Sequence, residues 1–320
     1  MNKKFLVTGC AGFIGSHAVD RLLAQGHVVI GIDNFSTGMR EFLVDAQDNK
    51  NFRLIEADLL DAQLLKKEFF GVDCVFHFAA NADVRHGLNQ PDRDLYQNTM
   101  VTFHVLEAMR HCKVRNIIFS STGSVYGECK VIPTPEDGPF PIQTSLYGAS
   151  KLACEGLIAA YCEGYGFQSH IFRFVSILGE RYTHGHVYDF YRKLKEDPKV
   201  LNVLGNGRQT KSYLYVHDCL DAIFMAMEKS EEKVNIFNLG YDGCCEVRDS
   251  VGWICHKLGL NPQVIYTDEV RGWVGDNPII YLDTRKICQL GWQPQYTIQE
   301  AIGLTVAYLQ NHEWVYERRA

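Results

Sequence analysis

Short apolar runs alternate with amphipathic stretches through the first half of this 320-residue chain. This alternation predicts parallel strands, because each parallel connection needs a crossover, which is usually a helix. The expected strands are mostly apolar along their length, as in a sheet that helices cover on both faces. The sequence therefore predicts an α/β fold with a doubly wound parallel sheet. Strands are expected at 5–7, 28–32, 52–56, 74–78, 116–120 and 168–174, and long helices at 14–24, 95–110 and 150–165.

The alternation stops after about Ser176, where a mixed segment rich in Tyr, His, Lys and Gly begins. A chain of this length exceeds the size at which single cores usually stop growing, so two lobes are expected. We expect a Rossmann domain over residues 1–175 and a smaller mixed α/β lobe over residues 176–320. A segment near 213–239 is a candidate to return to the first domain.

Composition excludes several classes of protein. The formal net charge of -6 disfavours a general binder of nucleic acid. The 11 cysteines form no Cys-x-x-Cys pair, and their odd number fits a reducing cytoplasm. The apolar run at 5–7 is too short for a signal core, and no stretch approaches the ~20 apolar residues of a membrane span. His184 and His186 lack further ligands at metal spacing, so we expect no metal site and a soluble cytoplasmic protein.

A glycine-rich turn lies between the first expected strand and helix, at Gly9-Cys10-Ala11-Gly12-Phe13-Ile14-Gly15. Glycines let the backbone turn tightly and approach a pyrophosphate, and the following helix N-terminus offers free N–H groups and partial positive charge. This is the only Gly-x-x-Gly-x-x-Gly among 27 glycines, and it stands in the required context. The turn predicts a dinucleotide site.

Two acidic residues follow the next two strands. Asp33 ends the second strand, 18 residues after Gly15. A carboxylate there accepts the hydroxyls of an adenosine ribose and repels a 2′-phosphate, which favours NAD over NADP. Asp58 follows the third strand and has two interpretations, a contact with the adenine edge or a helix cap before Asp61.

Tyr147 and Lys151 lie four residues apart at the start of an expected helix, so both side chains share one face. A nearby ammonium stabilises phenolate, and we expect it to lower the pKa of Tyr147. The phenol can then act as a base toward a substrate hydroxyl near neutral pH.

The same Tyr-x-x-x-Lys spacing recurs at 126–130 and 191–195, so spacing alone proves little. Only Tyr147 opens a helix 25 residues after a hydroxyl cluster at the end of a strand, Ser120-Ser121-Thr122. The carboxyl edge of such a sheet is where ligands bind, and Thr122 can hydrogen-bond the same substrate oxygen.

With these motifs the chain resembles the extended short-chain dehydrogenases/reductases, in the nucleotide-sugar epimerase/dehydratase branch. It is most similar there to UDP-glucose (UDP-galactose) 4-epimerases, over nearly the whole chain. The motifs that carry the resemblance are Thr-Gly-Cys-Ala-Gly-Phe-Ile-Gly-Ser-His at 8–17, Asp-Asn-Phe-Ser-Thr-Gly at 33–38, His-Phe-Ala-Ala at 77–80, Ser-Ser-Thr-Gly-Ser-Val-Tyr-Gly at 120–127, Tyr-Gly-Ala-Ser-Lys at 147–151, Gly-Asn-Gly at 205–207 and Arg-Gly-Trp-Val-Gly-Asp at 271–276.

The resemblance implies a role for each matching residue. Tyr147 is the implied base, Lys151 its partner and a ribose ligand, and Thr122 the assisting hydroxyl that also contacts substrate. Arg271 is an implied diphosphate ligand, and Lys211 stands where the family usually has another arginine. The implied NAD contacts are Gly9, Gly12, Phe13, Ile14, Gly15, Asp33, Asn34, Asp58, Leu59, Phe78, Ala79, Ala80, Asn98, Ser120, Tyr147 and Lys151.

The implied function is NAD-dependent 4-epimerisation of a nucleotide-diphosphate sugar, UDP-linked by preference, through a transient 4-keto sugar. Similar 4,6-dehydratases carry an Asp-Glu pair after the matching Thr, whereas this chain has Gly123-Ser124, which argues against dehydration. Ser176 replaces the family's usual Asn, which leaves the sugar open.

Three alternatives stay open beside the epimerase. One is a reductase or dehydrogenase of nucleotide sugars, and another is a different UDP-sugar-modifying enzyme such as a decarboxylase or dehydratase. The third is a non-catalytic NAD-sensing regulator, because fold alone does not fix function. The resemblance also implies a homodimer that pairs through the long helices near 95–110 and 150–165, and the smaller lobe is expected to bind the nucleotide sugar.

Overall fold

The computed structural model describes residues 2–81, 89–138, 142–270, 277 and 279–319. The chain divides into two compact units. Unit 1 comprises Met1–Val125, Ser145–Arg173 and Ala226–Phe237, and unit 2 comprises Tyr126–Thr144, Phe174–Met225 and Asn238–Ala320.

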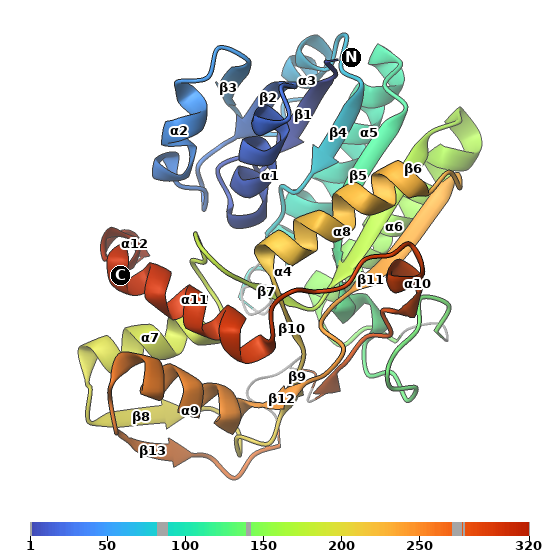
Figure 1. Ribbon diagram of the computed structural model, residues 1–320. Coiled ribbons are helices and arrows are strands. Elements are labelled where there is room, and N and C mark those ends of the chain that lie inside the picture. Colours follow the sequence, from blue (N-terminus) through green and yellow to red (C-terminus); the bar gives the residue numbers. More distant parts are fainter. Residues whose placement is uncertain (1, 82–88, 139–141, 271–276, 278, 320) are drawn as a thin grey trace. The chain divides into compact units, whose positions relative to one another are not determined.

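A seven-stranded sheet forms the centre of unit 1, in the order β11-β6-β5-β4-β1-β2-β3 (Figure 1). Strand β1 pairs in parallel with β2 and β4, and parallel pairing continues from β2 to β3 and from β4 to β5. The predicted doubly wound parallel sheet is thereby confirmed. The strands are β1 Lys4–Thr8, β2 Val28–Asp33, β3 Phe52–Glu56, β4 Cys74–His77, β5 Asn116–Thr122, β6 Gln168–Phe174 and β11 Val234–Leu239.

Helices cover both faces of this sheet, with α1 on one face and α5 and α6 on the other (Figure 1). The apolar strands pack against them, so that residues such as Phe119 of β5 and Ile158 of α6 belong to one buried cluster. The helices are α1 Phe13–Ala24, η1 Arg40–Leu43, α2 Val44–Gln47, α3 Ala62–Glu68, α4 Pro91–Asp94, η3 Leu95–Met100, α5 Val101–Cys112, η4 Gly123–Tyr126 and α6 Leu146–Tyr165.

Helix α6 begins four residues before its predicted start at Ser150. The hydroxyl of Ser145 accepts a hydrogen bond from the Gly148 N–H and so caps the first turn. The helix ends at Gly166, whose φ of 66° is the left-handed conformation common at helix C-termini. The early start places Tyr147 within the first turn of the helix.

The long regular helix predicted over 95–110 is wrong at its beginning. Residues Leu95–Met100 form a π-helix (η3) between α4 and α5. Buried Asn98 lies within it, where its Oδ1 accepts from the Asn81 N–H at 2.8 Å and its Nδ2 donates to Ser150 Oγ at 2.9 Å. Short π-helical turns are frequent at functional sites, where they direct one side chain out of the regular spacing.

The described part of unit 2 contains three small sheets and further helices. Strand β7 Ser176–Leu178 pairs in parallel with β10 Tyr213–Tyr215, and β8 Val200–Val203 pairs in parallel with β13 Gln263–Tyr266. A third sheet has the order β12-β9-β14. The remaining elements are α7 His186–Glu196, β9 Thr210–Lys211, α8 Val216–Lys229, β12 Cys245–Glu246, α9 Val247–Leu258, β14 Ile279–Ile280, α10 Arg285–Gln289, α11 Ile298–Asn311 and α12 Trp314–Arg319.

Within the described ranges, no helix of either unit is long and apolar enough to cross a bilayer.

Candidate active site

The glycine-rich turn connects β1 to α1, and two of its glycines are required by space. Gly9 has a φ of 68°, and a Cβ there would lie 2.7 Å from the Ala79 nitrogen. A Cβ on Gly15 would lie 2.0 Å from the Gly9 carbonyl oxygen. Gly12 is the N-cap of α1 and provides no side-chain cap to the first turn. The turn therefore brings backbone close to backbone, and the first turn of α1 receives no side-chain cap from its N-cap residue, which suits a pyrophosphate.

Asp33 ends β2 and is buried beside this turn. Its carboxylate accepts hydrogen bonds from the N–H groups of Ala11 at 2.9 Å and Phe35 at 2.8 Å. Burial raises the pKa of Asp33, and these two hydrogen bonds oppose that effect. The carboxylate thus braces the glycine turn, and its oxygens retain further acceptor capacity for ribose hydroxyls.

Asp58 and Asn34 lie together after β3 and β2. The amide of Asn34 donates to Asp58 at 3.2 Å, and Asp58 also accepts from the Leu60 N–H at 2.9 Å. The cap of α3 is Asp61, which accepts from two N–H groups of the first turn, so the cap interpretation of Asp58 is wrong. The side chains of Asn34 and Asp58 are exposed, whereas Leu59 is buried.

The predicted segment Phe78, Ala79 and Ala80 follows β4 and is half-buried. It is anchored by the buried His77, whose ring contacts Thr8 Oγ1 at 2.8 Å and Thr102 Oγ1 at 3.0 Å. Burial, and then the charge of Lys151, lower the pKa of His77 to about 3, so the imidazole is neutral. A neutral ring can link β1, β4 and α5 without adding a second buried cation.

Tyr147 is half-buried in the first turn of α6 and is hydrogen-bonded with Thr122 at the end of β5. Burial raises the pKa of Tyr147 to about 12, and the hydrogen bond with Thr122 partly opposes this. The predicted lowering of this pKa is therefore wrong for the chain by itself, because desolvation outweighs every favourable contact. The Thr122 hydroxyl, predicted to hydrogen-bond the substrate oxygen, is hydrogen-bonded with the phenol itself.

Lys151 lies one turn further along α6, where its side chain is only 2% exposed. Its Nζ is 4.3 Å from the centre of the Phe119 ring on β5. Burial lowers the pKa of Lys151 to about 8, while Cys154 and Glu155 act in the opposite direction. The side chain thus remains mainly an ammonium at pH 7.

A chain of hydrogen bonds ends at the backbone carbonyl of Tyr147 and so fixes the first turn of α6. Ser150 Oγ donates to the Tyr147 carbonyl at 2.8 Å and accepts from Asn98 at 2.9 Å. Asn81 in turn donates to Asp94 at 2.8 Å. Asn98 is one of the residues predicted from the sequence, whereas Asn81, Asp94 and Ser150 were not predicted. Ser150 could have been found, because it lies within the Tyr-Gly-Ala-Ser-Lys motif.

The hydroxyl cluster at the end of β5 is divided among three partners. Ser120 donates to the His77 carbonyl at 3.4 Å, and Ser121 donates to Glu155. Thr122 donates to Ser124 at 3.2 Å and accepts from the Ser124 N–H at 3.1 Å. Only Thr122 of the three faces Tyr147.

One of the two predicted diphosphate ligands, Lys211, belongs to unit 2. Lys211 is half-buried on β9, and its ammonium donates to the Asn277 carbonyl. Asn277 is itself anchored, since it accepts from Thr144 at 3.1 Å and donates to the Gly127 carbonyl at 3.1 Å. Arg271 lies outside the described residues.

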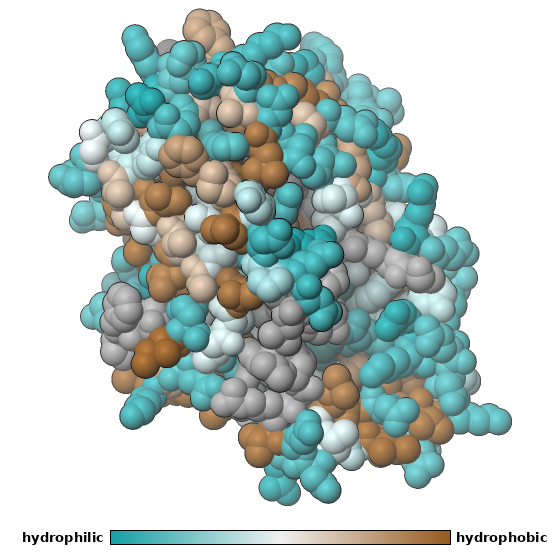
Figure 2. All heavy atoms as spheres, turned by 180° about the vertical axis from the view of Figure 1, so that it is seen from behind, coloured by the Kyte–Doolittle hydropathy of each residue, from teal (hydrophilic) through white to brown (hydrophobic). Residues whose placement is uncertain are grey.

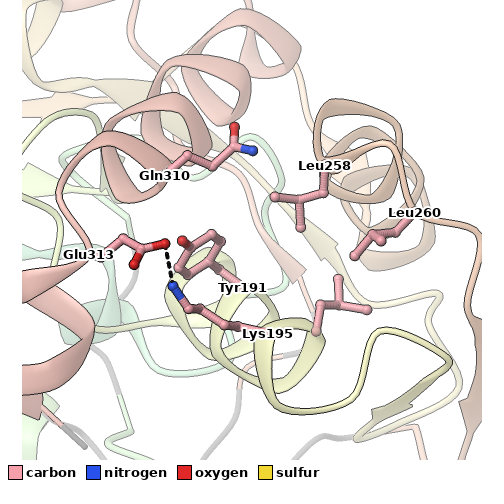
Figure 3. Close-up of a pocket in the computed structure, with 7 residues that line it drawn as sticks. Tyr191, Lys195, Leu258, Leu260, Gln310 and Glu313 are labelled. Carbon is pink, nitrogen blue, oxygen red and sulfur yellow. Dashed lines mark hydrogen bonds and ion pairs between the residues drawn. The ribbon is translucent and has the colours of Figure 1, made fainter.

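Unit 2 also contains a cavity of about 270 Å³, which is lined by another of the Tyr-x-x-x-Lys pairs, Tyr191 and Lys195 (Figure 3). Lys195 forms an ion pair with Glu313 at 2.6 Å. The lining also includes three leucines, Leu194, Leu258 and Leu260, and the side-chain amide of Gln310. Among the described residues of the chain, no group of three His, Cys, Asp or Glu side chains could hold a metal ion.

Comparison with known proteins gives consistent results. The sequence matches the model of the NAD dependent epimerase/dehydratase family over residues 5–240. A UDP-glucose 4-epimerase of Mycolicibacterium smegmatis is 32% identical over 312 residues, which cover 96% of this chain and 98% of that protein.

Two solved structures are similar over almost the full chain. A crystal structure of a UDP-galactose 4-epimerase is 37% identical, with a TM-score of 0.87, and covers 97% of this chain and 100% of its own. A UDP-glucuronic acid 4-epimerase from Bacillus cereus, in complex with UDP-glucuronic acid and NAD, is 28% identical with a TM-score of 0.89, covering 96% and 99%.

Proposed function

Since the chain belongs to the NAD-dependent epimerase/dehydratase family, we propose that it is a 4-epimerase of UDP-linked hexoses of the glucose/galactose type. Family membership makes it an NAD-dependent enzyme that modifies nucleotide sugars. The observation that carries the finer proposal is the half-buried phenol of Tyr147, hydrogen-bonded with Thr122 and followed one turn later by Lys151.

The residues of unit 1 fit NAD. The close backbone approach at Gly9 and Gly15 and the uncapped start of α1 suit the pyrophosphate. Asp33 suits the adenosine ribose and disfavours a 2′-phosphate. When bound, NAD supplies the acceptor and donor of the hydride that leaves and returns to the sugar C4.

Tyr147 takes the proton of the sugar O4 hydroxyl in this proposal, and a transient 4-keto sugar results. Because its pKa is about 12 in the chain alone, the phenol needs nearby positive charge to ionise. Lys151 is protonated below its pKa of about 8 and supplies part of that charge. Thr122 holds the phenol oxygen in place and can also donate to the substrate oxygen.

The cycle closes when C4 regains the hydride on its opposite face and O4 regains the proton from Tyr147, so there is no net redox change. General acid–base catalysis supplies roughly 10² to 10⁴-fold of the rate. The remainder comes from holding the reacting atoms in place, to which the capped first turn of α6 contributes.

The residues after Thr122 favour epimerisation over dehydration. Dehydration needs an acid–base pair that acts on the carbons beyond C4. In the similar dehydratases this pair is the Asp-Glu that directly follows the matching Thr. In this chain Gly123 and Ser124 stand at those two sequence positions, and the Ser124 N–H donates to Thr122. Reductase and decarboxylase activities are left as alternatives that the assay below distinguishes.

We further propose that unit 1 binds NAD and that unit 2 binds the nucleotide sugar through Lys211 and Arg271. A UDP-linked sugar carries two phosphates, and cationic side chains are the usual ligands of such groups. Lys211 acts as a point charge at a position where the family usually has an arginine. Its ammonium already donates to the Asn277 carbonyl, which fixes its direction within unit 2.

The test is a panel of nucleotide sugars incubated with the purified protein and no added cofactor, with products separated by chromatography. Interconversion of UDP-glucose and UDP-galactose is the expected result. A requirement for stoichiometric NADH would replace the proposal with a reductase, and release of CO₂ from UDP-glucuronic acid would replace it with a decarboxylase. Inactivity on every sugar, with NAD bound, would favour the regulator.

A homodimer through α5 and α6 is part of the proposal. The outer face of α6 carries small residues, including Ala153, Gly156 and Ala160, and α5 and its preceding turn expose Phe103 and Tyr96. Figure 2 shows apolar side chains gathered on the side of the molecule where these helices lie. Sedimentation of Gly156→Arg is expected to give a monomer, and an unchanged dimer would contradict this interface. The cytoplasmic location stays a prediction.

A further inference from the structure

Unit 1 contains a buried ionic cluster that includes a residue of α6, the helix that also carries Tyr147 and Lys151. Glu155 of α6 receives a two-pronged contact from Arg173 of β6, with Arg173 Nη2 to Glu155 Oε2 at 2.7 Å and Nε to Oε1 at 3.1 Å. Ser121 of β5 donates to the same carboxylate. All three side chains are buried. A fully bonded buried cluster of this kind fixes one arrangement of the elements that carry it.

The cluster joins the three elements that meet at the reacting groups. Ser121 precedes Thr122 at the carboxyl end of β5, and Arg173 lies at the corresponding end of β6. Glu155 stands one helical turn after Lys151 on the same face of α6. A shift of α6 along the sheet would therefore break these bonds and separate Tyr147 from Thr122.

Resting on the proposed function, we propose that Ser121, Glu155 and Arg173 are positioning residues for the epimerase reaction. They hold α6 in register with β5, so that Tyr147 meets Thr122, and Glu155 provides the buried negative charge that keeps Lys151 an ammonium. The hydrogen bonds given above join these three side chains to one another, so the role assigned to them is an indirect, positioning one.

Among the groups that act on Lys151, Glu155 is the one that supplies negative charge. From β4 the neutral His77 faces it, and from β5 the ring of Phe119. From α6 itself Cys154 and Glu155 act on it, both raising its pKa against burial. The guanidinium of Arg173 on β6 forms an ion pair with Glu155. Because burial raises the pKa of Cys154, the thiol stays protonated at neutral pH, so the charge comes from Glu155.

The experiment uses the NAD-loaded enzyme and measures kcat and KM for UDP-galactose against pH. Glu155→Gln removes the charge and is expected to lower kcat about tenfold or more while KM stays within about twofold. The alkaline limb of the kcat profile should move down by ~1 pH unit, because Lys151 loses its proton earlier. A purely structural role would not move this limb.

Glu163→Gln is the matched control, because Glu163 also lies on α6 and forms an ion pair, but an exposed one, with Lys233 at 2.7 Å. It should leave kcat and the pH profile unchanged. An equal shift of the limb in this variant would overturn the assignment to Glu155.

Glu155→Gln leaves Arg173 buried without its partner and can fail to fold. The double variant Glu155→Met/Arg173→Met removes both charges and replaces them with side chains of similar length, which is often neutral for stability. It should fold and still show the lowered alkaline limb. A double variant with wild-type kcat and pH profile would overturn the proposal.

Ser121→Ala removes one hydrogen bond and no charge. It is expected to lower kcat about threefold without moving the alkaline limb. An unchanged kcat would overturn the positioning role of Ser121 whether or not the Glu155 variants fold. If the wild type converts no UDP-hexose, the proposed function fails instead, and the cluster is then tested on reduction of bound NAD by whichever nucleotide sugar reacts, with the same expected ranking.

Discussion

Two helices of this chain carry the same Tyr-x-x-x-Lys spacing in opposite surroundings. In α6 the phenol of Tyr147 is half-buried and pairs with the Thr122 hydroxyl. In α7 the phenol of Tyr191 is buried and donates to the Leu309 carbonyl at 3.2 Å. The second phenol is committed to a backbone oxygen of its own unit, so only the first is placed to exchange a proton with a substrate.

The two lysines differ in the same way. Burial lowers the pKa of Lys151, whereas the hydrogen bond with Glu313 raises that of Lys195. The ammonium of Lys195 is partly exposed and already paired, as Figure 3 shows. A spacing of four residues thus supplies only a shared helix face, and burial and partners decide whether the pair can do chemistry.

Removal of the phenol hydroxyl of Tyr147 or of Tyr191 should give the largest difference in kcat between the two pairs. Tyr147→Phe is expected to lower kcat by roughly 10² to 10⁴-fold, because the base is lost, while NAD stays bound. Tyr191→Phe loses one hydrogen bond, to the Leu309 carbonyl of unit 2, and should keep kcat within about twofold. Steady-state rates and the NAD content of both purified variants provide the measurement. Equal losses in the two variants would contradict the account.

Replacement of the two lysines should give the next largest contrast. Lys151→Met is expected to lower kcat by about 10²-fold and to weaken NAD retention, since it removes a charge beside the phenol and an implied ribose ligand. Lys195→Met removes only a partly exposed ion pair and should change the free energy of unfolding by less than about 1 kcal/mol. NAD content after gel filtration, with thermal unfolding, separates the two. Full NAD retention and activity in Lys151→Met would refute the role of this ammonium.

Thr122→Val should have a smaller effect, of about tenfold in kcat. The substitution removes the hydrogen bond that lowers the pKa of Tyr147, so the phenol ionises less readily. Ser124→Ala, which keeps the N–H that Thr122 accepts from, is the control. If both variants lose the same activity, the Thr122 hydroxyl has no special function.

The smallest expected effect is on the pH dependence of the free energy of unfolding. The pKa of Lys151 is lowered from 10.5 to about 8 in the folded chain, so between these values the unfolded chain binds more protons. The free energy of unfolding should therefore gain a contribution that grows as pH rises from 8 to 10.5. The difference in Tm between the wild type and Lys151→Met isolates it, with Lys195→Met as the reference. A contribution that shrinks with pH over this range would show that burial does not depress this pKa.

Much of the fold could be predicted because it depends on local pattern. The apolar strands and the glycine turn predicted the doubly wound sheet, and the family resemblance carried by the same motifs is confirmed by the family match over residues 5–240. The start of α6 was misplaced because a single hydroxyl, that of Ser145, decides it. The π-helical turn at Asn98 was missed because its cause is a set of contacts with Asn81 and Ser150, which are distant in sequence.

The electrostatics of the site could not be predicted from spacing. The sequence shows that Lys151 follows Tyr147 on one helix face, but the pKa of the phenol depends on how much water the fold removes from it. The pairing of Ser121 and Arg173 on Glu155 likewise depends on the order of β5 and β6 in the sheet. Short-range patterns identified the residues, and long-range packing sets their charges.

The most direct test of the central claim is the fate of a label at the reacting carbon. UDP-galactose that carries deuterium at C4 is incubated with the purified enzyme in ordinary water, and the UDP-glucose formed is analysed by mass spectrometry. If the hydride leaves C4 and returns within one bound complex while Tyr147 exchanges the proton, the product keeps its deuterium, and Tyr147→Phe forms almost no product. Loss of the label to water, or labelled product formed by Tyr147→Phe at the wild-type rate, would contradict the account.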